Sequence, residues 1–151
     1  MDFWPDDNWF ESNKGEFLGG GGARTGYACS SDPDSVIKEA RGGTPAPNFI
    51  ENFVWAQIKD TDLAPLFGEV RAMSKSGRFL LMERLDKIEE ADVTPVMPDW
   101  MRDVWSNNFG KNAAGEVKCR DYANVSMGET LAAAERYPQA WQMKKGPVTR
   151  S

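Results

Sequence analysis

The pattern of apolar and polar positions in the first half of the chain predicts mainly β-strands. The stretch EFLGGGGARTGYACSS, residues 16–31, predicts two strands joined by a glycine loop. SVIKEA, residues 35–40, predicts a further strand because Val36 and Ile37 are β-branched. RGGTPAPN, residues 41–48, is rich in glycine and proline and predicts a connection without regular structure.

A helix and a second pair of strands are predicted next. The apolar residues spaced for one face of a helix are Phe49, Ile50, Phe53, Val54 and Ile58. Asn48 is the expected N-cap of this helix. Two strands, at about 70–73 and 78–82, are expected to be joined by Lys75-Ser76-Gly77.

The rest of the chain predicts less regular structure. IEEADVTPVMPDW, residues 88–100, is acidic and broken by prolines, and residues 109–122 predict a hairpin with Gly115 in its turn. The Ala-rich segment 129–145 predicts a final helix that Pro138 stops or kinks. This order of elements indicates an α+β fold whose sheet lies mostly in the first half.

The N-terminal residues 1–16 mix aromatic and acidic side chains. The aromatic residues of this segment are Phe3, Trp4, Trp9 and Phe10. We expect an arm whose aromatic rings pack on the body of the domain. A segment that binds a partner is the alternative interpretation.

The composition of the chain limits the binding and catalytic functions that are possible for it. The formal net charge of −5 argues against binding to a nucleic-acid backbone. The chain has no histidine, which excludes Ser-His-Asp triads, Cys-His pairs and HExxH zinc sites. Catalysis would therefore depend on carboxylates, amides, Lys or Arg, together with a hard metal ion that prefers oxygen ligands.

The sequence favours a cytoplasmic protein. No apolar run approaches the ~20 residues of a membrane span, and the acidic start lacks the features of a signal peptide. The two cysteines, Cys29 and Cys119, are expected to be reduced thiols, with one disulfide as the alternative.

Four stretches carry candidate chemistry when they are read in order. The glycines that let backbone N–H groups approach phosphate are Gly19, Gly20, Gly21 and Gly22. Lys38 lies on a strand, and Glu51 lies among the apolar residues of the helix, where it either occupies a flank or turns inward because it has a cationic partner. The polar residues of the second half are Asp103, Asn108 and Asp121. Each residue has an ordinary structural role as its alternative: a turn, a surface charge, a loop cap or a structural ion pair.

At this point the sequence resembles the protein-kinase-like superfamily. Lys38 in SVIKEA is similar to the strand lysine of the family motif V-A-I-K, and Glu51 to the helix glutamate that pairs with it. The stretch MRDVWSNN, residues 101–108, resembles the catalytic loop H-R-D-L-x-x-x-N. Asp121-Tyr122-Ala123 resembles the metal-binding D-F-G. The resemblance covers residues 15–125 and is closest in style to compact bacterial and phage proteins and to the aminoglycoside-phosphotransferase branch.

The resemblance implies one minimal two-lobed kinase-like domain. It would consist of an arm at 1–14, an N-lobe at 15–83 with an antiparallel sheet and one helix, and a truncated C-lobe at 84–151. Segment 79–85 would join the lobes, with Glu83 and Leu85 contacting the adenine ring.

The resemblance also implies an ATP- and Mg²⁺-dependent phosphotransferase that acts on a hydroxyl acceptor. Lys38, oriented by Glu51, would hold the α- and β-phosphates beneath the glycine loop. Asn108 and Asp121 would bind the metal ion, and Asp103 would accept the proton of the acceptor hydroxyl.

Some residues depart from the family pattern and leave other hypotheses open. Arg24 stands at the third glycine position, Met101 replaces the loop histidine, and Ala123 replaces the D-F-G glycine. One alternative is a pseudokinase that binds or inhibits a host or partner protein; another is an unrelated α+β interaction domain. A short second lobe would also expose apolar surface, so a homodimer or a protein partner is expected, and the candidate residues are Trp100, Trp105 and Trp141.

Overall fold

The structure is a computed structural model, and it describes residues 5–102, 106–125 and 143–145. The chain divides into two compact units. The first consists of Met1–Asn52 and Glu69–Arg84, and the second of Phe53–Gly68 and Leu85–Ser151. The fold is α+β, as predicted, and the larger sheet belongs to the first unit.

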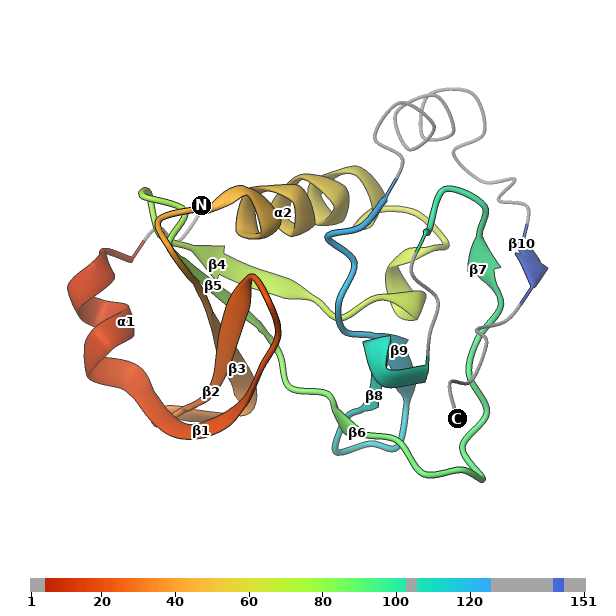
Figure 1. Ribbon diagram of the computed structural model, residues 1–151. Coiled ribbons are helices and arrows are strands. Elements are labelled where there is room, and N and C mark those ends of the chain that lie inside the picture. The colour runs from red at the N-terminus through yellow and green to blue at the C-terminus, as the bar shows by residue number, and fades with distance from the viewer. Residues whose placement is uncertain (1–4, 103–105, 126–142, 146–151) are drawn as a thin grey trace. The chain divides into compact units, whose positions relative to one another are not determined.

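The first unit contains a five-stranded antiparallel sheet in the order β1-β2-β3-β5-β4 (Figure 1). The strands are β1 (Lys14–Gly20), β2 (Arg24–Cys29), β3 (Asp32–Ala40), β4 (Val70–Met73) and β5 (Phe79–Glu83). The predicted strands are therefore confirmed, because β-branched and apolar runs alternate here with glycine-rich turns. The central strand β3 pairs Ile37 with Tyr27 on one side and with Leu81 on the other.

A short helix, α1 (Asp7–Asn13), was missed by the sequence analysis. The Asp6 side chain caps it by accepting a hydrogen bond from the N–H of Trp9 at 2.9 Å. Phe10 is fully buried and stacks on Phe79 of β5, with ring centroids 5.1 Å apart. The predicted packing of the aromatic arm is confirmed for Trp9 and Phe10, whereas Phe3 and Trp4 lie outside the described residues. This packing stabilises a helix too short to form alone. The core around Phe10 consists of Cys29, Ile37, Ala72, Phe79 and Leu81.

Helix α2 (Ala46–Ile58) follows β3 in the chain and begins two residues before Asn48, its predicted N-cap. Asn48 is therefore not its N-cap. Its buried side chain instead donates hydrogen bonds to the carbonyl oxygens of Gly77, at 2.9 Å, and Arg78, at 3.0 Å. Asn48 thus ties the first turn of α2 to the connection between β4 and β5.

The β4–β5 connection depends on Gly77. Its φ of +77° lies in the left-handed region that favours glycine. A Cβ atom at this position would stand 2.5 Å from Cε2 of Phe49. Conformation and close packing therefore both require glycine here.

The second unit contains small sheets and short turns. They are η1 (Ala64–Leu66), β6 (Asp86–Lys87), β7 (Met97–Pro98), η2 (Ser106–Asn108), β8 (Phe109–Lys111), β9 (Val117–Cys119) and β10 (Met143–Lys145). The predicted hairpin is confirmed as β8–β9, with Gly115 at φ +86° in its turn. Strand β6 also pairs with β8, and β10 pairs with β7.

The helix predicted for residues 129–145 lies mostly outside the described residues. Its last three residues form β10, so the prediction of a helix there is wrong. Residues Trp105 and Trp141 also lie outside the described residues.

An aromatic group forms the centre of the second unit. Phe67 stacks on Trp100, with ring centroids 5.6 Å apart, and contacts the Tyr122 ring edge-on at 5.0 Å. The Tyr122 hydroxyl donates to the carbonyl oxygen of Gly68 at 2.8 Å. Because Trp100 is only 3% exposed, its prediction as an exposed partner-binding residue is wrong.

Two further expectations bear on the cellular setting. Cys29 and Cys119 are both buried, free thiols, as expected. Among the described residues, no helix has the length and apolar character needed to cross a membrane.

Candidate functional site

The first unit joins two of the predicted site residues in a buried ion pair. Lys38 lies on β3 and Glu51 on α2, and Lys38 Nζ is 2.9 Å from Glu51 Oε1. Glu51 is fully buried, whereas the Lys38 side chain is 15% exposed. A buried carboxylate is stable only with such a partner. Of the two placements expected for Glu51, the structure shows the inward one.

Arg24, at the start of β2, is a third member of this cluster that the sequence analysis missed. Its Nη1 donates to Glu51 Oε1 at 2.7 Å and its Nη2 to Glu51 Oε2 at 3.0 Å. Nη1 also lies 3.2 Å from Oδ1 of Asn48. The two-pronged contact is the strong form of a carboxylate–guanidinium bond. The sequence feature that could have indicated this role is Arg24 itself, which stands where the family pattern has its third glycine.

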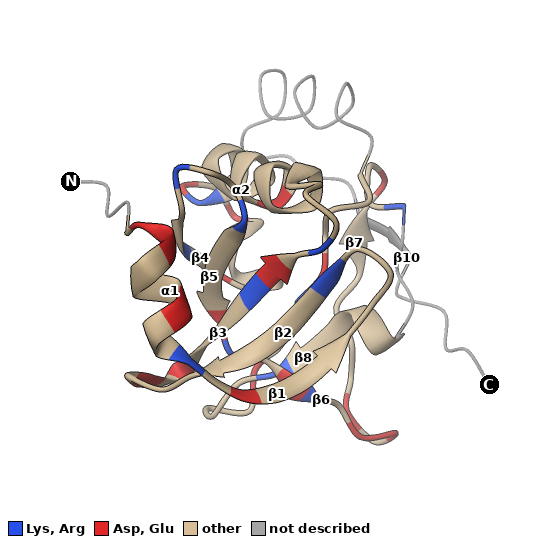
Figure 2. Cartoon of the chain, turned by 60° about the vertical axis from the view of Figure 1, so that its left-hand side comes forward, with Lys and Arg blue, Asp and Glu red and all other residues tan. Residues whose placement is uncertain are grey.

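The charges around Glu51 keep it ionised. Burial raises the pKa of this carboxyl, but the nearby charges of Lys38 and Arg24, with their hydrogen bonds, outweigh burial and lower the pKa to about 2. Figure 2 shows that basic positions of β2 and β3 lie on neighbouring strands. One buried anion therefore fixes two cations from two adjacent strands.

The glycine loop differs in detail from the prediction. Gly19 and Gly20 end β1, and the N–H of Gly21 donates to the carbonyl oxygen of Arg24 at 2.9 Å. None of the glycines at 19–22 has a positive φ, so left-handed backbone does not explain the glycine run. A Cβ atom at Gly19, Gly21 or Gly22 would meet nothing within 4 Å. The missing side chains thus leave open space beside the backbone.

Glu83 and Leu85, predicted to contact adenine, are both held by backbone hydrogen bonds. The N–H of Glu83 donates to the carbonyl oxygen of Glu69 at 2.8 Å, as part of the β4–β5 edge. Leu85 is buried in the second unit, and its carbonyl oxygen accepts a hydrogen bond from Arg120 Nη1 at 3.0 Å. The Glu83 N–H therefore already has a hydrogen-bond acceptor in the sheet. The contact of Glu83 and Leu85 with an adenine ring stays a prediction.

Asn108 and Asp121 lie in the second unit on connected stretches of chain. The N–H of Arg120 donates to the carbonyl oxygen of Asn108 at 2.7 Å. Asp121 is the next residue in the chain after Arg120. Asn108 is 8% exposed. Asp121 is exposed, whereas the next residue, Tyr122, is fully buried.

Arg120 organises this region and was also missed. Its Nε and Nη2 each donate to the carbonyl oxygen of Asn107 at 3.2 Å, in addition to the bond with Leu85. Burial lowers the pKa of this guanidinium from its ordinary value. One side chain thus links the turn before β8 with the chain after β9. No motif in the sequence distinguishes this arginine from its neighbours.

Asp103, the predicted proton acceptor, lies outside the described residues. The chain on either side of it is described: Met101 forms an isolated bridge with Val125. In the portions of the chain that the structure describes, no group of three or more His, Cys, Asp or Glu forms a metal cluster. The carboxylate of Asp121 and the amide oxygen of Asn108 are donors that suit Mg²⁺, which keeps several water ligands.

Comparison with known proteins gives no independent identification. The sequence matches no family model, and no curated protein is significantly similar to it.

Proposed function

We propose that this protein is a small kinase-like phosphotransferase that transfers the γ-phosphoryl group of ATP to a hydroxyl acceptor with the help of Mg²⁺. The observation that carries the proposal is the buried Lys38–Glu51 pair, which links the central strand of the sheet to the following helix at 2.9 Å. The two free thiols agree with a reducing, cytoplasmic setting.

The arrangement of the first unit supports this proposal. The glycine loop joins β1 and β2, the lysine lies on β3, and α2 lies between β3 and β4 in the chain. An antiparallel sheet with one such helix is the N-lobe expected from the resemblance. A structural ion pair alone would not require this order of loop, strand lysine and helix glutamate.

Each residue has a defined role in the proposal. Lys38 binds phosphate oxygens of ATP, and Glu51 holds Lys38 in place. Asn108 and Asp121 hold the metal ion, which neutralises phosphate charge when bound. Asp103 accepts the proton as the acceptor oxygen bonds to the γ-phosphorus and the bond to the β-phosphate oxygen breaks.

A transfer assay with γ-labelled ATP tests the proposal. Acceptors would be the protein itself, hydroxyl-bearing peptides and sugars. We expect wild-type transfer that is lost in Lys38→Ala and Asp121→Asn, and retained in Lys75→Ala, an exposed lysine with no described role. Failure of the wild type both to bind ATP and to transfer phosphate would refute the phosphotransferase and leave an α+β interaction domain.

One observation favours a second candidate, a nucleotide-binding module without transfer activity that binds a partner protein or a second copy. Arg24 donates to both oxygens of Glu51, and Lys38 donates to Oε1. Such a clamp can hold the cluster in a structural role. ATP binding without transfer to any acceptor, together with unchanged binding in Lys38→Ala, would identify this second candidate.

A further inference from the structure

The first unit has a pocket of about 560 Å³ that the proposed phosphotransferase does not use. It is lined by the ends of β2 and β3, the connection from β3 to α2, and the β4–β5 turn. The residues that matter for its chemistry are Thr25, Glu39, Arg41, Gly42, Gly43 and Arg78. Its size is within the range of small-molecule sites, roughly 300–1,000 Å³.

The pocket faces away from the Lys38–Glu51 cluster. Lys38 and Glu39 are consecutive residues of β3, and consecutive strand side chains point to opposite faces of the sheet. Lys38 bonds to Glu51, whereas Glu39 bonds to Lys14 and Arg78. The two sites therefore share a strand but no side chain.

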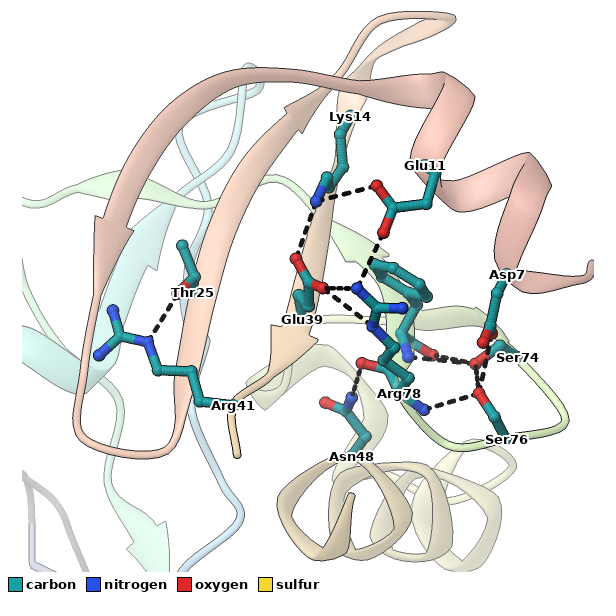
Figure 3. A network of polar contacts seen from close by, with 11 residues as sticks. Asp7, Glu11, Lys14, Thr25, Glu39, Arg41, Asn48, Ser74, Ser76 and Arg78 are labelled. Atoms are coloured by element: carbon teal, nitrogen blue, oxygen red, sulfur yellow. Dashed lines mark hydrogen bonds and ion pairs between the residues drawn. The ribbon is translucent and has the colours of Figure 1, made fainter. Parts of the chain in front are cut away.

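The single acidic residue of the pocket lining is already neutralised. Oε1 of Glu39 accepts from Lys14 Nζ at 2.9 Å, and Oε2 accepts from Nε and Nη2 of Arg78 at 2.9 and 2.6 Å (Figure 3). Burial raises the pKa of Glu39, but the hydrogen bonds from these two cations outweigh it and hold the pKa below its ordinary value. Arg78 Nη2 also pairs with Glu11 at 2.9 Å, so two carboxylates hold Arg78 at the pocket wall.

Arg41 supplies positive charge from the other side of the pocket. Its Nε donates to the Thr25 hydroxyl at 2.7 Å, which fixes the guanidinium (Figure 3). Its Nη2 packs so closely on Gly20 that a Cβ atom there would overlap it. Among the described residues, no carboxylate forms an ion pair with Arg41.

The backbone beside Arg41 is unusually open. Gly42 and Gly43 have φ values of +62° and +70°, and the N–H of Thr44 donates back to the carbonyl oxygen of Arg41 at 3.2 Å. A Cβ atom at either glycine would meet nothing within 4 Å. This tight turn brings main chain without side chains to the pocket wall, next to a fixed guanidinium.

We propose that this pocket binds a phosphate group, carried by a small phosphomonoester, between Arg41 and Arg78. Planar guanidinium groups match phosphate oxygens in geometry and charge. The pocket volume exceeds that of a lone phosphate and leaves room for the rest of a small ester.

Titration followed by ¹H–¹⁵N NMR tests the proposal at constant ionic strength. The probes are inorganic phosphate and glycerol 3-phosphate, in the absence of ATP and Mg²⁺. We expect saturable shifts of the Gly42 and Gly43 amides. Arg41→Gln is expected to weaken binding about tenfold, and Lys75→Gln, which removes an exposed charge outside the lining, to change it less than about twofold.

A second variant tests the position of the guanidinium without removing its charge. Gly20→Ala is expected to displace Arg41 and to weaken phosphate binding, while the NMR spectrum of each variant reports whether it is folded. Tighter binding of glycerol 3-phosphate than of phosphate supports the ester, and equal affinity identifies free phosphate as the ligand. Absence of saturable shifts, or equal weakening in Arg41→Gln and Lys75→Gln, would overturn the proposal.

Discussion

Glu51 is the residue on which most of the account depends. It is fully buried, and its two oxygens accept hydrogen bonds from Lys38 and from both terminal nitrogens of Arg24. The pair of cations comes from neighbouring strands, so one carboxylate connects the start of β2, the C-terminal part of β3 and helix α2. Its removal would leave two poorly exposed cations facing each other.

We therefore expect Glu51→Gln to lower the free energy of unfolding by about 3–5 kcal/mol, the typical cost of breaking a buried ion pair. Urea denaturation followed by circular dichroism measures this change. Glu16→Gln, which alters an exposed carboxylate of β1, is the matched control and is expected to change stability by less than about 0.5 kcal/mol. A Glu51→Gln variant as stable as the control would contradict the structural role of the cluster.

The same residue predicts a pH dependence. Its pKa in the folded protein is about 2, below its ordinary value of 4.5, so the folded state favours the ionised form. This contribution to stability is present above pH 4.5 and is lost as the pH falls from there towards 2. Wild-type stability, measured by urea unfolding from pH 6 downwards, is expected to decline more steeply across this window than that of Glu51→Gln. Parallel curves for the two proteins would count against the assignment.

At the scale of elements, the β4–β5 turn and helix α2 hold each other in place. Asn48 donates to the carbonyl oxygens of Gly77 and Arg78, and the Phe49 ring lies where a Gly77 side chain would be. Because Asn48 also contacts Arg24, the turn is connected to the Glu51 cluster.

Gly77→Ala is expected to destabilise the protein by about 1–3 kcal/mol, through its positive φ and the clash with Phe49. The control is Gly19→Ala, where φ is not positive and a Cβ atom meets nothing within 4 Å. Thermal unfolding would compare the two, and adding Phe49→Ala to Gly77→Ala should recover the steric part of the loss only. Equal melting temperatures for both single variants would show that the turn tolerates a side chain.

The elements were predictable from the sequence to different degrees. The five strands of the large sheet were predictable because each is a short apolar run bounded by turn residues. This pattern is local in the sequence. Helix α1 was missed because its seven residues depend on the stacking of Phe10 on Phe79, which no local pattern records. The start of α2 was misplaced because Asn48 resembles a cap but bonds to a distant turn.

The site was predictable only in part. The family resemblance indicated Lys38 as the partner of Glu51, and Lys38 does donate to one oxygen of Glu51. Arg24 and Arg120 act through contacts with residues 27 and 35 positions away in the chain, so spacing could not indicate them.

At the scale of the whole molecule, the chain passes repeatedly between its two units. Residues 53–68 belong to the second unit, although the resemblance implied contiguous lobes at 15–83 and 84–151. The proposed phosphate-binding residues Lys38 and Glu51 belong to the first unit, and the proposed metal ligands Asn108 and Asp121 to the second.

The most direct test is the melting temperature of the full chain with and without ATP and Mg²⁺. At about a hundredfold excess over Kd, a ligand adds roughly 2.7 kcal/mol to the free energy of unfolding. We predict a rise of several degrees that is abolished both by Lys38→Ala and by Asp121→Ala, and retained in Lys75→Ala. A melting temperature that ATP and Mg²⁺ leave unchanged in the wild-type protein would contradict the account.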